Sequence, residues 1–175
     1  MVSLWVDNYD RRGPFEEVLR GAAARIDGYQ VLESLVTEYG DNEWAPARTW
    51  PDGARSPGLL TVAAIEMPAG RDHGQWLDYW HSTVSTVSGR IQPRCRYVRN
   101  AVFRSITPDA PPFRALVEEA WPSGGHIIDP MLFYCADGDQ AVLEANMKLM
   151  IETIAAFTDL STLRSYTMSE WILKS

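Results

Sequence analysis

The sequence predicts an α+β fold in which helices cover one face of an antiparallel sheet. Three observations support this prediction. Short β-favouring runs alternate with longer runs that have helical spacing, clusters of Gly and Pro separate these runs, and the second part of the chain has the order β-α-β-β-α-β. The 175 residues are about the length of one domain, and with 46% hydrophobic and 22% charged residues the composition is that of a globular protein.

The first 40 residues predict an incomplete β-α-β unit. Residues 2–6 form a short β-favouring run. Pro14 can occupy the first turn of a helix, because the apolar residues after it recur at helical spacing. Gly28 stops this helix, and residues 29–36 form the next predicted strand.

Residues 41–58 predict an ordered loop, because turn-forming residues dominate them. Trp44 and Trp50 are costly to expose, so we expect them to pack over a pocket or a subunit interface. The larger unit, residues 59–175, completes a single predicted domain over residues 1–175. Its predicted elements are strand 59–67, helix 73–91, strand 96–106, strand 115–121, helix 129–135, helix 139–157 and strand 166–173.

The order of the larger unit is that of the ferredoxin-like, split β-α-β arrangement. Helices on one face of a sheet leave the other face uncovered, and an apolar face must be buried. The simplest cover is a second subunit, so we expect a homodimer formed through the sheet.

Charge and cysteine content exclude several classes of protein. The formal net charge of -7 argues against a nucleic-acid surface, which needs clustered Lys and Arg. The two cysteines make no disulfide framework, and we expect both to be buried thiols. No leader opens the chain and no apolar run has the length of a membrane span, so we expect a cytoplasmic protein with no membrane partner.

A local basic run lies around the third predicted strand. It allows two interpretations: solvent-facing positions that alternate along a strand, or an anion or carboxylate site for at least one of its members. The run consists of Arg90, Arg94, Arg96, Arg99 and Arg104.

Four short motifs resemble the EthD-like family. Trp76-Leu77-Asp78-Tyr79-Trp80-His81 is similar to the family's helix motif, in which a Tyr/Trp pair precedes a His. The runs 96–100, 117–121 and 169–172 are similar to three of its strands. The resemblance covers roughly residues 57–175 and implies a ferredoxin-like dimeric α+β barrel.

The resemblance also bears on activity. Members and neighbours of this superfamily are associated with ring closure, dehydration or decarboxylation of polyketides, with cofactor-free oxygenation of aromatics and with haem chemistry. This chain departs from the common short form, because it has an additional amino-terminal segment. It also has Ser82-Thr83 where the family has a His-Ala-Pro-like continuation.

The predicted helix over residues 73–91 carries the first candidate catalytic residue, His81. At about 100° per residue, Trp76 and Trp80 lie in the apolar arc of this helix, His81 lies just outside it, and Ser85 lies further round. A His at this edge can enter a cavity between helix and sheet and move protons near neutral pH. The alternative is a half-buried His whose partner is a backbone carbonyl. Trp76 and Trp80 are candidate substrate-binding residues.

The predicted strands carry the other candidates. Tyr97 and Arg99 share one strand face and can hold a carboxylate or enolate, although Arg99 can equally pack over aromatic rings; Asn100 is on the other face. Glu119 and Trp121 share a face of the next strand. An apolar environment would favour neutral Glu119 as a general acid or base, whereas the alternative is a salt bridge to an Arg.

In the turn that follows, His126 can reach a pocket mouth, and Asp129 can cap a helix that begins at Pro130. The three His residues show no metal-binding spacing, so we expect no metal. Phosphate- and dinucleotide-binding motifs are also missing, and we expect no cofactor.

The leading hypothesis is therefore a small-molecule enzyme. Its aromatic or polyketide-like substrate would undergo cofactor-independent acid/base chemistry, namely cyclisation, dehydration or decarboxylation. His81, Glu119 and Tyr97 would be catalytic. The substrate would be bound by Arg99, Trp76, Trp80, Asn100, Trp121 and His126. The alternatives are a non-catalytic ligand-binding or assembly protein of the same fold, and a cofactor-free or haem-linked monooxygenase.

Overall fold

A five-stranded antiparallel sheet forms the centre of the computed structural model, which describes residues 1–174. The strand order is β1-β3-β4-β2-β5, and every neighbouring pair is antiparallel. The strands are β1 (Tyr29–Thr37), β2 (Leu59–Glu66), β3 (Arg96–Ser105), β4 (Phe113–Trp121) and β5 (Arg164–Met168). Each helical connection skips one strand, because β2 and β3 flank β4 while β4 and β5 flank β2.

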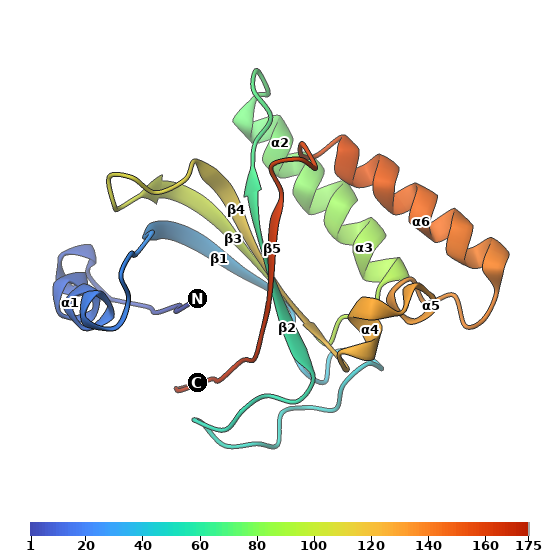
Figure 1. Ribbon diagram of the computed structural model, residues 1–175, viewed down its shortest axis with the longest axis horizontal. Coiled ribbons are helices and arrows are strands. Elements are labelled where there is room, and N and C mark those ends of the chain that lie inside the picture. Colours follow the sequence, from blue (N-terminus) through green and yellow to red (C-terminus); the bar gives the residue numbers. More distant parts are fainter. Residues whose placement is uncertain (175) are drawn as a thin grey trace.

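Two long helical segments lie on one side of this sheet (Figure 1). The first runs without a break through α2 (His73–Tyr79), a π-helical turn η2 (Trp80–Val84) and α3 (Ser85–Ile91). The second is α6 (Gln140–Ala155). Asp72 and Asp139 start α2 and α6, because their carboxylates accept hydrogen bonds from free backbone N–H groups of the first turn. The sheet–helix layers of the predicted α+β fold are thus present.

The core between helices and sheet is built on large aromatic residues. Trp76 stacks on Phe157 at a ring distance of 4.8 Å, and its indole N–H donates to the Phe157 carbonyl oxygen. Trp80 packs beside both rings and is 1% exposed. Residues from three strands complete the cluster on the sheet side: Ile65, Tyr97, Ala115 and Val117. This cluster fixes the helices on the sheet and forms one end of the site described below.

The opposite face of the sheet is covered in part by the chain itself. The loop after β1 places Trp44 and Trp50 against Leu60 and Val62. The carboxyl-terminal tail joins this cover, since the Glu170 carbonyl accepts a hydrogen bond from the Ser56 N–H. The two tryptophans therefore pack, as the sequence predicted. A second subunit is not needed to bury the central strands on this face.

The amino-terminal prediction was only half right. Residues 2–6 have no strand partner and lie outside regular structure, with Trp5 69% exposed. The predicted helix is present as α1 (Gly13–Ala22), preceded by a 3-10 turn η1 (Tyr9–Arg12), but α1 has no buried residue. Figure 1 shows α1 on the side of the sheet away from α2, α3 and α6. Because β1 pairs with β3 at the edge of the same sheet, this region is not a second β-α-β unit.

Two other predicted boundaries differ from the structure. The predicted helix 129–135 is two short helices, α4 (Gly125–Ile128) and α5 (Pro130–Phe133), and Asp129 caps the second of them through the Met131 N–H as expected. The predicted strand 166–173 is the shorter β5, followed by a single bridge between Arg55 and Trp171. Within residues 1–174, no helix has both the length and the apolar character that crossing a membrane requires.

Candidate functional site

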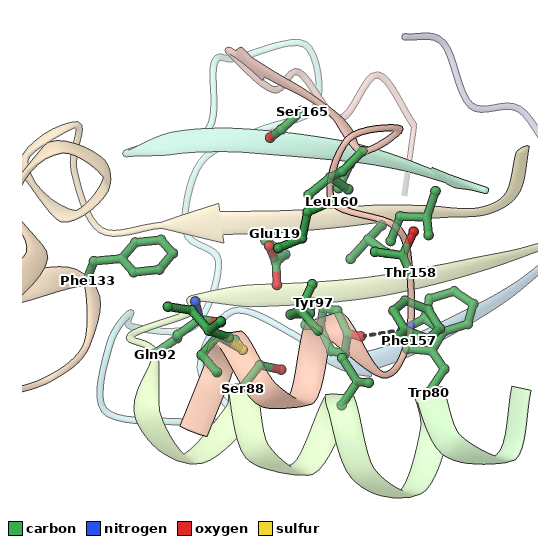
Figure 2. Close-up of a pocket in the computed structure, with 18 of the residues that line it drawn as sticks. Trp80, Ser88, Gln92, Tyr97, Glu119, Phe133, Phe157, Thr158, Leu160 and Ser165 are labelled. Atoms are coloured by element: carbon green, nitrogen blue, oxygen red, sulfur yellow. Dashed lines mark hydrogen bonds between the residues drawn. The ribbon is translucent and has the colours of Figure 1, made fainter. Parts of the chain in front are cut away.

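A cavity of about 290 Å³ lies between the helix-facing side of the sheet and the helices α3, α5 and α6. Most of its wall is apolar, which is typical of small-molecule sites, and its volume is close to the lower end of their range of about 300–1,000 Å³. Figure 2 shows Tyr97 and Glu119 on the sheet side, Trp80 and Phe157 at one end and Phe133 at the other.

Glu119 is the charged side chain among the described residues that line the cavity. Its Oε1 accepts a hydrogen bond of 2.9 Å from Arg94 Nη1, and the Arg94 side chain is 5% exposed. The guanidinium also lies 3.9 Å from the ring centre of Tyr97 and donates weakly to the Ser85 carbonyl oxygen, at 3.4 Å. The salt bridge to an Arg, considered for Glu119 from the sequence, is therefore present. The second oxygen of Glu119 has no hydrogen-bond partner among residues 1–174.

Local sequence places Arg94 at this point. Helix α3 ends at Ile91, and Pro93 stands between Gln92, the C-cap of the helix, and Arg94. Gly89 in the last turn of α3 leaves room for the guanidinium, because a Cβ at Gly89 would lie 3.2 Å from Arg94 Nη2. Within residues 1–174, the basic run in the sequence thus contains two carboxylate-binding members: Arg94, which is buried, and Arg96, which pairs with Glu38 and Glu170.

The Tyr97 hydroxyl is held inside the protein by two hydrogen-bonding groups, the Trp80 indole and the Ser85 hydroxyl. Trp80 Nε1 donates to Tyr97 Oη over 3.2 Å, a bond drawn in Figure 2. Ser85 gives its one hydroxyl proton to the Trp80 carbonyl oxygen, so at 3.0 Å Tyr97 must donate to Ser85 Oγ. Burial raises the pKa of Tyr97, and the Glu119 carboxylate raises it further. Tyr97 therefore lines the cavity as a neutral phenol whose proton is already engaged.

His81, predicted as the acid/base residue of the cavity, is not among the residues that line it. The side chain lies on the exposed outer part of η2, in ring contact with Trp80 at 5.4 Å. Burial lowers the pKa of His81, and the positive charge of Arg99 lowers it further, while Asp78 opposes the shift.

The three predicted tryptophans have different places. Trp80 lines the cavity, as predicted. Trp76 is a core residue whose stacking on Phe157 keeps it off the cavity wall. Trp121 donates from its indole N–H to Thr61 Oγ1 and stacks at 4.9 Å on Phe133, which does line the cavity. Trp121 thus supports the wall from behind and does not meet a ligand directly.

The remaining predicted binding residues lie elsewhere. Arg99 donates to Ser85 Oγ at 3.3 Å and stays outside the cavity, while its Nε atom is buried without a partner. Asn100 lies on the opposite sheet face, where it donates to Glu118. His126 bonds to Ser123 in the turn before α4 and does not reach the cavity. Strand alternation explains why Asn100 lies on the sheet face opposite to the cavity, since neighbouring side chains of a strand point to opposite faces.

Several cavity residues were not found from the sequence. Gln92 and Ser88 face it from the end of α3, and Phe133 and Tyr134 close it near α5. Their only sequence signal is proximity to the predicted helix ends, which does not identify a pocket. Helix α6 adds a wall of apolar side chains that includes Met150, Ile151 and Ile154.

Within residues 1–174, no three His, Cys, Asp or Glu side chains lie close enough together to bind a metal ion. Comparisons with known protein families, with curated proteins and with solved structures find no match to this chain.

Proposed function

We propose that this protein is a small-molecule enzyme that binds an aromatic or polyketide-like molecule in the sheet–helix cavity and moves a proton with Glu119. The observation that carries the proposal is a carboxylate, held by a buried guanidinium, on an otherwise mostly apolar wall. Aromatic side chains around it match a flat apolar substrate. This keeps the reaction class expected from the sequence, and of the two predicted acid/base residues it retains Glu119 and leaves out His81.

The geometry of the ion pair suits such chemistry. Arg94 holds Oε1 of Glu119, so the orientation of the carboxylate is fixed before a ligand arrives. The free oxygen can then accept a proton from a carbon next to a substrate carbonyl, or from a substrate hydroxyl. Cyclisation, dehydration and decarboxylation of carbonyl compounds each need such a transfer. The engaged hydroxyl of Tyr97 makes this residue a positioning group that supports Trp80 and the cavity shape.

Proton transfer can be tested without the natural substrate. The probe is 2-acetylnaphthalene in D2O, and NMR follows deuteration of its methyl group. We expect the wild-type protein to accelerate exchange about 10²–10⁴-fold over Glu119→Gln, the usual contribution of a general base. Glu17→Gln, the same substitution at an exposed position outside the cavity, is the control and should keep the wild-type rate. Equal rates for wild type and Glu119→Gln, with the probe bound to both, would reject the role of Glu119.

A second candidate function is ligand binding without catalysis. It is favoured by the engagement of Tyr97 and of one Glu119 oxygen within the protein, which leaves few free polar groups on the wall. In that case 2-acetylnaphthalene binds, but its exchange rate equals that in buffer. The same experiment therefore separates the two functions.

The strand order supports the family proposed from the sequence. Two β-α-β connections that each skip one strand are the arrangement of the ferredoxin-like fold, and here β1 adds a fifth strand at the edge. We propose that the chain is EthD-like and pairs through its sheet. Apolar side chains exposed on β1, among them Val31 and Leu35, favour this pairing. Sedimentation should give a dimer for the wild type and a monomer for Val31→Glu/Leu35→Glu; a monomeric wild type would reject the pairing.

A further inference from the structure

A second pocket, of about 340 Å³, adjoins the apolar cavity at the end of α3. Unlike the cavity, it is lined mainly by polar side chains, and Asn42, Glu43 and Trp44 of its lining belong to the loop after β1. Asn42 fixes this loop to the body, because its amide donates to the Arg94 carbonyl oxygen over 2.8 Å. The pocket-lining residues that matter here are Thr37, Glu43, Trp44, Gln92 and Arg94.

Gln92 lines both the apolar cavity and the polar pocket. It is 5% exposed, yet its side-chain amide makes no hydrogen bond with any residue from 1 to 174. The amide atoms are not shut off from solvent, so they are open to the pockets and free to hydrogen-bond a polar group that enters them. Figure 2 shows the Gln92 side chain projecting into the space between Phe133 and Glu119. The amide is therefore placed where a ligand passing from one pocket to the other would meet it.

The charges around the polar pocket favour a neutral ligand group. The positive charge of Arg94 is already balanced by Glu119, so an added anion would gain little. Glu43 would repel an anion, and Arg94 would repel a cation. A hydroxyl group is neutral and can both donate and accept, which matches a carboxylate, an amide and the further N–H donors of the guanidinium. Trp44 adds an aromatic surface beside these groups.

We propose that the apolar cavity and the polar pocket form one composite site for a ligand with a flat apolar body and a neutral, hydroxyl-rich extension such as a sugar. The body occupies the apolar cavity, the extension occupies the polar pocket, and the Gln92 amide hydrogen-bonds the ligand at the junction. This inference rests on the proposed binding of a small apolar molecule in the cavity and specifies the class of that molecule.

The test compares two ethers of 2-naphthol that share the apolar body. One is 2-methoxynaphthalene and the other is 2-naphthyl β-D-glucopyranoside, and calorimetry measures both dissociation constants. We expect the wild-type protein to bind the glucoside about tenfold more tightly, as one or two net hydrogen bonds would give. Gln92→Leu removes the amide, and Thr37→Phe fills the polar pocket from β1. Both should bring the ratio of the two constants close to one, whereas Gln140→Leu, at an exposed position outside both pockets, should keep it.

Each outcome decides between the two proposals. If 2-methoxynaphthalene binds and the glucoside gains nothing, the composite site is wrong while the proposed cavity function stands. A gain that persists in both Gln92→Leu and Thr37→Phe also overturns the composite site. If neither ether binds to the wild-type protein, the binding of flat apolar molecules in the cavity is wrong, and the composite site is wrong with it.

Discussion

The buried ion pair between Arg94 and Glu119 gives the sharpest prediction for stability. Arg94→Met keeps the apolar stem but removes the guanidinium, and so leaves the Glu119 carboxylate without its partner. The lost hydrogen bond to a charged group contributes about 1.5–3 kcal/mol, and the lost contact with the Tyr97 ring contributes about 0.5–2 kcal/mol. The Glu119 side chain keeps 20% exposure, so water offsets part of the loss.

We therefore expect Arg94→Met to lower the free energy of unfolding by about 3 kcal/mol, at the lower end of values for breaking a buried pair. For a chain of this length, that corresponds to a decrease in Tm of about 6–12 °C. Urea unfolding followed by circular dichroism measures the first quantity and thermal melting the second. The exposed pair between Arg20 and Glu16 is the matched control, and Arg20→Met should cost less than about 1 kcal/mol.

The double variant Arg94→Met/Glu119→Leu tests the physical reason. It removes both charges, and with them the cost of burying them, so we expect it to be within about 1 kcal/mol of the wild type. Costs of the two single variants that simply add in the double variant would refute the argument, because they would show no coupling between the groups. A cost below about 1 kcal/mol for Arg94→Met would refute it as well.

Three further predictions concern single groups. Gly89→Ala should lower Tm, although Ala favours helices by about 1 kcal/mol, because the new Cβ crowds Arg94 Nη2; a raised Tm would contradict this. Burial raises the pKa of Glu118, so its carboxylate destabilises the fold only above that pKa, and Glu118→Gln should raise Tm near pH 8 but not near pH 4. The pKa of His81, followed by NMR, should be below its ordinary value and rise in Arg99→Gln; no change would show that the Arg99 charge does not reach it.

The sheet and both long helices could be predicted because their signals are local. Strands β2, β3 and β4 have dense β-favouring residues, and α6 has apolar residues at helical spacing between its capping Asp139 and Phe157. Residues 2–6 have equal β propensity but no neighbouring strand to bond with, which propensity alone does not reveal. A strand forms only where a neighbouring strand can bond to its backbone, and the whole fold decides where neighbouring strands lie.

The site was predicted less well, because a cavity depends on residues that are distant in sequence. Tyr97, Glu119 and Trp80 were found since each belongs to a strand or helix with a clear buried face. Arg94 was placed in the right local group of charges, but its pairing with a residue 25 positions away depends on the register between β3 and β4. Sequence spacing gives faces of single elements and does not give the contacts between them.

The π-helical turn η2 explains why the orientation predicted for Ser85 in the helix over residues 73–91 was wrong. At about 100° per residue, Ser85 would lie about 180° away from Trp76, on the solvent side. In the structure Ser85 is 9% exposed and hydrogen-bonded to Tyr97, because the wider turn from Trp80 to Ser85 adds one residue and rotates the rest of the helix.

The same rotation sets the chemistry of the cavity. It turns Ser88 inward at 3% exposure, places Gln92 at the boundary of the two pockets and leaves Val87 half-buried. A regular helix would present Val84 and Val87 to the sheet and would make this wall apolar. One added residue in η2 therefore supplies the polar groups on which both the Tyr97 network and the proposed composite site depend.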